Sequence, residues 1–188
     1  SFLGVDDSFT QAGFDVVFDN RLDPVLARNA VYGRAAWDRL SFASEGINRT
    51  EIEGRGYLGI LGHNVLVLRA LRADSDQRLP PYLRPLLGGV ANLRGLGAGT
   101  AVGDTLVAGS IELLVPLTSP LRLVKIGVSV FTDVATVYDK GERLADQALR
   151  RGAGGTVWFS AAFLRLNVAV AHGAGSSTRV QAGGGLSF

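Results

Sequence analysis

Apolar and polar residues alternate along most of this chain. In residues 124–134, VKIGVSVFTDV, one face is built of valine and isoleucine, and the other face carries Lys125 and Asp133. Residues 164–173, LRLNVAVAHG, repeat the pattern, with leucine and valine on one face and Arg165 on the other. A period of two residues is typical of β-strands that have one apolar and one polar face.

The same alternation predicts about nine strands, separated by turns rich in Gly, Asn, Asp, Pro and Ser. The longest interruption covers residues 74–102, and only residues 141–151, GERLADQALRR, have the composition of a short surface helix. No stretch divides the chain in composition, so we expect a single domain over residues 1–188. The predicted strands are residues 12–20, 30–42, 49–61, 64–73, 103–116, 124–134, 152–162, 164–173 and 179–188.

Alternation alone does not say which face is inside. A soluble sandwich buries its apolar face, whereas a membrane barrel turns that face to lipid and lines its lumen with the polar face. Three features favour the membrane barrel: small residues and isolated charges on the polar faces, strand lengths that suit a tilted crossing of the bilayer, and an aromatic residue, Phe188, at the end of the last strand. We therefore expect an all-β fold, an antiparallel transmembrane β-barrel or the C-terminal half of one, with eight or nine strands.

Composition narrows the classes further. The chain has 25 glycines among 188 residues and no cysteine, which excludes disulfides and thiolate metal sites. Its formal charge of +2 is too small, and its basic residues are too scattered, to favour nucleic acid as a partner. No apolar run reaches the roughly 18–20 residues of a membrane helix. Because the chain begins at Ser1 and has no methionine, we expect a processed or excised piece of a longer protein.

The last predicted strand ends in the sequence QAGGGLSF. A polar residue, Gln181, is followed at fixed spacing by Gly183, the apolar Leu186 and the aromatic Phe188. This pattern resembles the β-signal of bacterial outer-membrane barrels, the last strand that the assembly machinery reads. The alternative is an ordinary edge strand that ends by chance on phenylalanine.

A glycine-rich loop, LLGGVANLRGLGAGT at residues 86–100, contains a single charge, Arg94. It lacks the Gly-Lys-Ser/Thr sequence and the following helix of a phosphate-binding loop. With the strands that follow, it resembles the surface-antigen barrel of the BamA/TamA family of outer-membrane assembly factors and their two-partner-secretion relatives. In that family a long extracellular loop folds back into the lumen, and its tip matches Leu93, Arg94, Gly95 and Leu96 of this chain.

Two strand motifs extend the resemblance, which spans about residues 14–188 in the family's motif order. Glu-x-Arg-x-Pro is matched around Glu112, and Phe-x-Asp-x-Gly is matched around Asp133. Three motif positions differ, so we expect the loop tip to pack differently from the family's. They are Leu96 in place of an aromatic residue, Leu114 in place of an arginine and Ala135 in place of a glycine.

The resemblance implies that Arg94 docks on two acidic residues of the inner wall, Glu112 and Asp133. The alternation agrees, because both carboxylates lie opposite the apolar face of their strands and are expected to point into the lumen. A carboxylate away from bulk water needs a partner, and arginine offers a planar fork of donors. The alternative is that both carboxylates line a wet lumen and pair with Lys125 or Arg165.

No constellation indicates catalysis. There is no Gly-x-Ser-x-Gly sequence, and His63 and His172 fall at a turn and at a strand end. Glu51 and Glu53 share a strand face and would suit acid–base chemistry or a metal ion, but Arg55 two residues on favours an ion-pair ladder in the lumen. We therefore expect no enzymatic activity, no metal and no cofactor.

Four aromatic residues are candidates for the girdles that mark membrane surfaces in barrels. For one of them, Trp158, a position facing the lumen is the alternative. The four are Trp37, Trp158, Tyr32 and Tyr57.

The resemblance implies a function in the bacterial outer membrane: insertion of nascent barrels or export of a partner protein, without nucleotide. The partners it implies are outer-membrane lipid or lipopolysaccharide and client or partner polypeptides. Nine strands are too few for the family barrel, so missing strands or another chain would complete it, unless eight strands close alone. A passive pore on the same scaffold, and a soluble β-barrel that binds an apolar ligand, are the competing hypotheses.

Overall fold

The structure, a computed structural model, describes residues 8–23, 26–43, 45–121, 124–161 and 164–186. Nine long strands form one sheet in which each strand pairs with its neighbours in the chain, and every pair is antiparallel. The strands are β1 (Thr10–Asp19), β2 (Ala30–Ser41), β3 (Gly46–Gly59), β4 (Val65–Ser75), β7 (Thr105–Leu121), β8 (Val124–Tyr138), β9 (Arg150–Ala161), β10 (Leu164–Gly173) and β11 (Thr178–Leu186).

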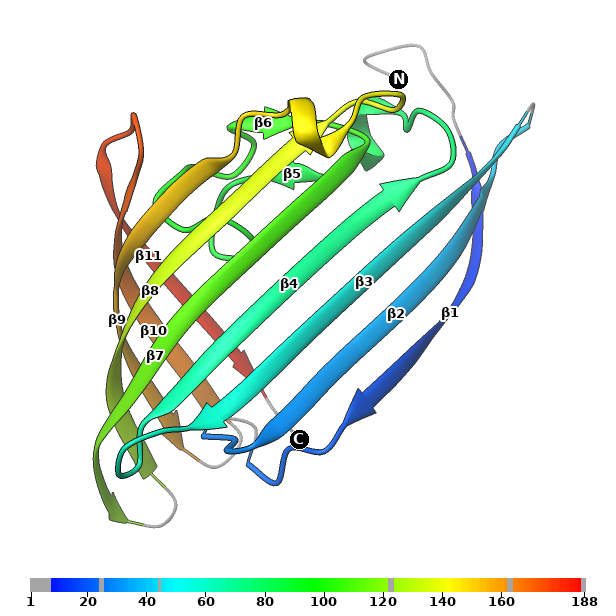
Figure 1. The fold of residues 1–188 in the computed structure, drawn as a ribbon. Helices are drawn as coiled ribbons and strands as arrows, with labels where there is room; N and C mark the ends of the chain where they lie inside the picture. Colours follow the sequence, from blue (N-terminus) through cyan, green and yellow to red (C-terminus); the bar gives the residue numbers. More distant parts are fainter. Residues whose placement is uncertain (1–7, 24–25, 44, 122–123, 162–163, 187–188) are drawn as a thin grey trace.

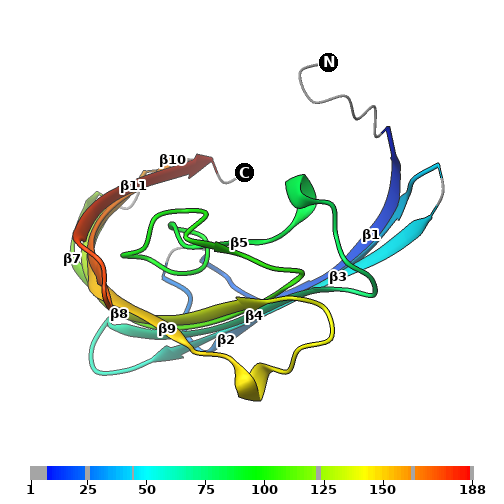
Figure 2. The same ribbon diagram turned by 90° about the horizontal axis from the view of Figure 1, so that it is seen from above.

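The nine strands make an up-and-down meander that curves into an open half-barrel. Figure 1 shows the strands running obliquely side by side, and Figure 2, seen from above, shows the curvature. Register shifts are recorded in the β7–β8 pair beyond Pro116, where the hairpin extends past its neighbours. The prediction of an all-β antiparallel fold is confirmed, and the expected strands differ from the observed ones by only a few residues at most ends.

The convex face of the sheet is apolar. Large hydrophobic side chains stand exposed along it from one edge to the other, among them Phe14, Val130 and Val180. Successive residues of a strand point to opposite faces, so the concave face receives the small, polar and charged residues. A soluble sandwich or barrel would bury the apolar face, and its exposure favours contact with lipid.

The sheet does not close on itself. Strands β1 and β11 lie at its opposite edges, and no pairing joins them within the described ranges. Because the sheet has nine antiparallel strands, an odd number, both edge strands run in the same direction (Figure 1). Closure of eight strands alone is therefore wrong for this structure.

The long break between β4 and β7 lies on the concave side of the sheet (Figure 2). It contains a 3₁₀ turn, η1 (Pro81–Leu83), and a hairpin of two short strands, β5 (Leu86–Leu87) and β6 (Ala101–Val102). The sequence pattern did not indicate this hairpin. It closes the base of the loop, so that residues 88–100 form a compact excursion toward the inner wall.

The helix expected in residues 141–151 is wrong. Only a single 3₁₀ turn forms there, η2 (Leu144–Asp146), and Arg150 already belongs to β9, opposite Ala135 of β8. An isolated segment of this length is marginal as a helix in water, and the ladder bonds to β8 offer its last residues a better arrangement. None of the helical turns in the described ranges has the length and apolar character to cross a membrane.

The four aromatic candidates divide between the two faces. Trp37 stands on the convex face against Phe14, with ring centroids 5.8 Å apart. Tyr57 and Trp158 are buried on the concave face, and Tyr32 shares that face, so the girdle hypothesis is wrong for these three. The strand register decides this, because one residue more or less turns a side chain to the other face.

Candidate functional site

The tip of the long loop is shaped by glycines and one asparagine. Gly88 has φ of +105° and Gly95 has φ of +92°, a region that residues with a Cβ rarely adopt. Asn92 bridges the turn: its Oδ1 accepts a hydrogen bond from the N–H of Gly88 at 2.8 Å, and its Nδ2 donates to the carbonyl of Leu86 at 2.9 Å. The chain thereby doubles back and presents its tip to the wall.

Two leucines anchor the tip. Leu93 is completely buried and Leu96 is 5% exposed, each packed against side chains of the inner wall and the loop base. Burial of a leucine side chain contributes about 1.5–3 kcal/mol. Leu96 stands where the family has an aromatic ring, and here it fills an aliphatic cluster. The other buried members of that cluster are Ala73, Leu87, Leu106, Ala108 and Ala135.

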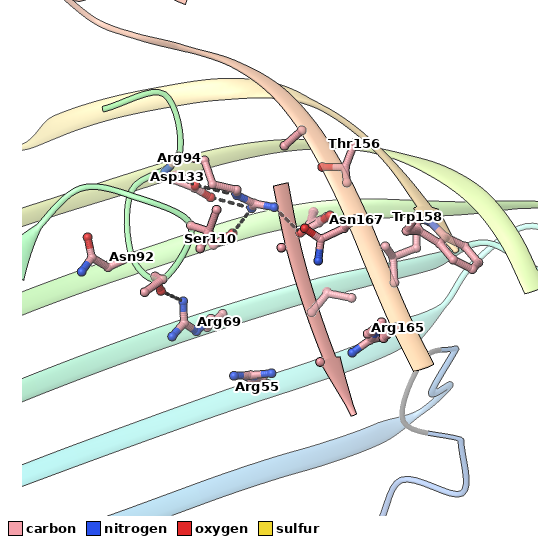
Figure 3. A pocket seen from close by; sticks show the side chains of 18 of the residues that line it. Arg55, Arg69, Asn92, Arg94, Ser110, Asp133, Thr156, Trp158, Arg165 and Asn167 are labelled. Carbon is pink, nitrogen blue, oxygen red and sulfur yellow. Dashed lines mark hydrogen bonds and ion pairs between the residues drawn. The ribbon is translucent and has the colours of Figure 1, made fainter. Parts of the chain in front are cut away.

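Between these leucines, Arg94 is held by two carboxylates (Figure 3). Its Nε donates to Oδ2 of Asp133 and its Nη2 to Oδ1, both at 2.8 Å, which is a bidentate pair. Nη1 donates to Oε2 of Glu112 at 2.8 Å, and Nη2 also reaches Oγ of Ser110 at 3.1 Å. The guanidinium lies 3.4 Å from the ring centroid of Phe131, a cation–π contact.

Strand register places these partners together. Ser110 of β7 lies directly opposite Asp133 of β8, and Glu112 lies opposite Phe131. All four side chains therefore stand on one face of two neighbouring strands. Glu112 is also fixed by the hydroxyl of Ser129, which donates to its Oε1 at 2.5 Å. The acceptors are thus positioned by the wall, and the loop supplies the donor.

Burial makes this pair unlike a surface salt bridge. The side chain of Asp133 is 3% exposed and that of Arg94 is 15% exposed. Burial by itself would lower the pKa of Arg94, but the hydrogen bonds and charges of Asp133 and Glu112 outweigh it and raise the pKa. The backbone N–H of Arg94 also donates to Asp133 at 3.0 Å, so the same carboxylate holds both the main chain and the side chain of the tip.

The tip passes close to β9 and β10, where glycines leave room for it. A Cβ at Gly152 of β9 would lie 2.1 Å from the carbonyl oxygen of Arg94, and a Cβ at Gly173 of β10 would lie 2.8 Å from Cγ of Leu96. Any side chain at either position would push the tip away from the wall. Sequence reasoning missed both glycines, because nothing local distinguishes them from the other strand glycines.

The last strand also touches the tip. The Oε1 of Gln181 accepts a hydrogen bond from the N–H of Gly95 at 3.4 Å, and its Nε2 donates to the carbonyl of Leu96 at 3.3 Å. The contacts are long, but they are reciprocal and bind the backbone. The tip thus contacts each of the last five strands of the sheet, from β7 to β11.

The other residues of the predicted β-signal lie elsewhere. Gly183 pairs with Asn167 of β10 on the concave side. Leu186 ends β11, and its side chain, like the whole of Phe188, falls outside the described residues. Among the described residues of that motif, Gln181 alone is brought to the loop tip.

The remaining candidates form ion pairs away from the tip. Glu53 is held by Arg55 at 2.7 Å and by Arg69 at 2.5 Å. Glu51 pairs with Arg34 of β2 at 2.7 Å. Lys125, one of the two alternative partners expected for the wall carboxylates beside Arg165, binds Asp23. Over the described ranges, no three His, Asp or Glu side chains gather as a metal site would require.

Comparisons with known proteins agree with this architecture. None of the curated protein sequences compared with the chain matches it. Among solved structures, the fold resembles the crystal structure of BamA from Haemophilus ducreyi lacking POTRA domains 1-3, with a TM-score of 0.74 and 17% sequence identity. The match covers 93% of this chain and 42% of that chain, so the chain spans less than half the length of this relative.

A structural match at 17% identity shows the fold alone, so the family is assigned from the sequence. The Omp85 superfamily domain matches residues 5–188, nearly the whole chain. Nine antiparallel strands with an apolar convex face, and an inward loop, are the structural counterpart of that match. The chain belongs to the Omp85 superfamily.

Proposed function

We propose that this chain forms the wall and the inward loop of a bacterial outer-membrane barrel that inserts or translocates other polypeptides without nucleotide. The observation that carries the proposal is Arg94, held between Asp133 and Glu112 on the inner wall. A buried ion pair is weak evidence for stability, because desolvation offsets most of its attraction, and its best attested role is to fix one arrangement among several. Here it fixes one position of the loop.

The edge strand β11 supplies the second part of the proposal. Three successive glycines, residues 183–185, lie in it. Glycine weakens a strand because it adds no cross-strand contacts and loses more entropy on ordering. A weakly held edge presents unpaired N–H and C=O groups that another strand can join. Client strands would be captured at this edge.

Gln181 connects the two parts. It belongs to β11 and holds the backbone of the loop tip, which Arg94 fixes to β7 and β8. Movement of β11 away from β10 would therefore break contacts of the tip. We propose that loop docking and opening of this edge are energetically coupled.

Closure of the barrel needs strands beyond these nine. Both edges run in the same direction, so a second copy in the same membrane orientation would meet β1 through a parallel pair. Bacterial single-chain barrels are antiparallel throughout, with an even strand number, and an open edge in lipid leaves polar groups unsatisfied. Antiparallel closure requires that the first added strand runs opposite to β11 and the last added strand opposite to β1. We therefore propose completion by an odd number of further strands that alternate in direction. A second copy of these nine does not qualify, because its first strand would run parallel to β11.

The test replaces Arg94 by alanine in the protein that carries this chain, reconstituted in liposomes. We expect insertion of a client barrel to slow at least about tenfold, because two carboxylates lose their shared partner and the loop no longer has one position. Arg39→Ala is the matched control, since Arg39 stands on the convex face with the side chain of Asn48 as its hydrogen-bond partner.

Insertion rate and the temperature of the heat-induced gel-mobility shift are measured together. If both are the same in the Arg94 variant as in the parent protein, the loop has no such role. If ion conductance changes while client insertion does not, the chain belongs to a passive pore, the second candidate function.

A further inference from the structure

A cavity of about 550 Å³ lies on the concave side beside the loop tip (Figure 3). Its walls come from strands far apart in the chain: Arg55 and Arg69 on β3 and β4, Arg165 and Asn167 on β10, and Thr156 on β9. Arg94 and its carboxylates form one end of it. The loop makes a second contact on the cavity wall, where Nη1 of Arg69 donates to the carbonyl of Ala91 at 2.5 Å.

Positive charge predominates in this cavity. Four arginines line it, and two of them, Arg55 and Arg69, lie directly opposite each other on neighbouring strands. Like charges in that arrangement repel. They share one carboxylate oxygen, Oε1 of Glu53, to which the Nε atoms of Arg55 and Arg69 donate at 2.8 and 2.5 Å. One carboxylate therefore serves two guanidinium groups.

The remaining carboxylates are already engaged. Glu112 and Asp133 both bind Arg94. Arg165 reaches in from β10, so four guanidinium groups and two carboxylates line the cavity. Arg165 lines the cavity beside the glycines of β11.

A buried hydroxyl adds a donor that the protein does not use. Oγ1 of Thr156 is buried and has no hydrogen-bond partner in the described part of the chain. Such a group costs about 1–3 kcal/mol when it is left unsatisfied. It lies in the wall of the cavity with the amide of Asn167, so an entering polar group would find neutral donors beside the charges.

The shape of the cavity suits an extended segment. Gly183, Gly184 and Gly185 form one side, and at Gly185 a side chain would meet no atom within 4 Å. Tyr57 and Trp158 supply flat apolar walls. Room beside an exposed backbone, two aromatic faces and convergent cations are features of a site that receives a flexible chain carrying an anionic group.

We propose that this cavity binds an oxyanion, a carboxylate or a phosphate group, carried on the molecule that enters the lumen. Arg55, Arg69 and Arg165 would supply the charge, and Thr156 and Asn167 the neutral donors. In the context of the proposed function, which this inference deepens, the oxyanion is a carboxylate of an acidic polypeptide segment. Arginine is suited to both anions because its donors form a rigid fork.

The test measures binding by calorimetry to the detergent-solubilised protein that carries this chain, with two probes. One is a blocked peptide of alternating glutamate and glycine, and the other is inorganic pyrophosphate. We expect at least one probe to bind, with the Kd raised about tenfold or more in Arg165→Gln. Arg143→Gln, which removes the same charge from an exposed loop, should leave the Kd unchanged.

The outcomes separate the sources and the proposals. Binding of the peptide alone assigns a carboxylate ligand, and binding of pyrophosphate alone assigns a phosphate ligand. The site is overturned if Arg165→Gln and Arg143→Gln bind the probes with the same Kd, or if neither probe binds the parent protein. If Arg165→Gln fails to fold by gel mobility, Thr156→Val tests the same wall, with a Kd raised severalfold. Since no client is present, failure here leaves the insertion proposal untouched, and failure of insertion leaves this site standing.

Discussion

At the scale of single residues, Asp133 is the centre of the docking site. It accepts the bidentate fork of Arg94 and the backbone N–H of the same residue, and its side chain is almost completely buried. Glu112 accepts one hydrogen bond from Arg94, and its side chain is more exposed. The two carboxylates are therefore unequal, and Asp133 should matter more for the position of the loop.

This inequality gives a prediction. Asp133→Asn keeps the shape of the side chain but removes its charge, which leaves the guanidinium with Glu112 as its only carboxylate. We expect a loss of about 3 kcal/mol in the free energy of unfolding, the lower range for breaking a buried pair. The measurement is urea unfolding of the liposome-bound protein that carries the chain.

Asp15→Asn is the matched control for that measurement. Asp15 pairs with Arg34 at 3.1 Å, and half of its side chain is exposed, so water weakens the attraction. An exposed pair of this kind contributes about 0–1 kcal/mol. Equal losses in the free energy of unfolding in the two variants would show that the docking pair stabilises the protein no more than an exposed pair does.

At the scale of elements, the loop and the last five strands form one unit. The tip is close enough to β9 and β10 that two glycines of these strands admit only hydrogen at their Cα positions. These close approaches constrain the loop in addition to the ion pair. The docked position is thus selected by shape as well as by charge.

Gly152→Ala tests the contribution of shape. Its Cβ would stand 2.1 Å from the carbonyl oxygen of Arg94, so the tip must move away from β9. We expect trypsin to cleave after Arg94 at least about tenfold faster, because the docked peptide bond is shielded and cleavage tracks the open population. Mass spectrometry identifies the fragment that ends at Arg94.

Gly54→Ala on β3 is the control, since a side chain there meets nothing within 4 Å. Its cleavage rate should equal that of the parent protein. Unchanged cleavage in the Gly152 variant would mean that the loop accommodates the methyl group without undocking.

At the scale of the whole molecule, the edge strand β11 and the tip of the glycine-rich loop are in contact on the concave side of an open sheet. Gln181 couples them in our proposal, and coupling free energies are reciprocal. Whatever holds β11 to β10 must therefore also hold the tip against the wall. The absence of cysteine from the sequence makes this testable with introduced pairs.

We predict that Asn167→Cys with Gly183→Cys, directly opposed residues of β10 and β11, forms a disulfide that locks the edge. Under oxidising conditions client insertion should stop and cleavage after Arg94 should slow, and a reductant should restore both. The pair Ala70→Cys with Gly109→Cys, opposed on β4 and β7 in the interior of the sheet, is the control and should alter neither rate. Insertion that continues through a locked β10–β11 edge would contradict capture at this edge.

The sequence by itself determined most of the strands and which residues of a strand share a face, because a period of two residues is a local property of the pleated backbone. It therefore placed Glu112 and Asp133 on the concave face, and it indicated an inward loop through its glycines and single arginine. The tertiary structure decided which distant groups meet: Ser110 and Phe131 around the guanidinium, Gly152 and Gly173 under the tip, and Gln181 beside it. It also decided the η2 turn and the inward position of three aromatic rings. These depend on strand register, on curvature and on the path of the loop across the sheet, and such contacts between residues far apart in the chain leave no periodic signal along it.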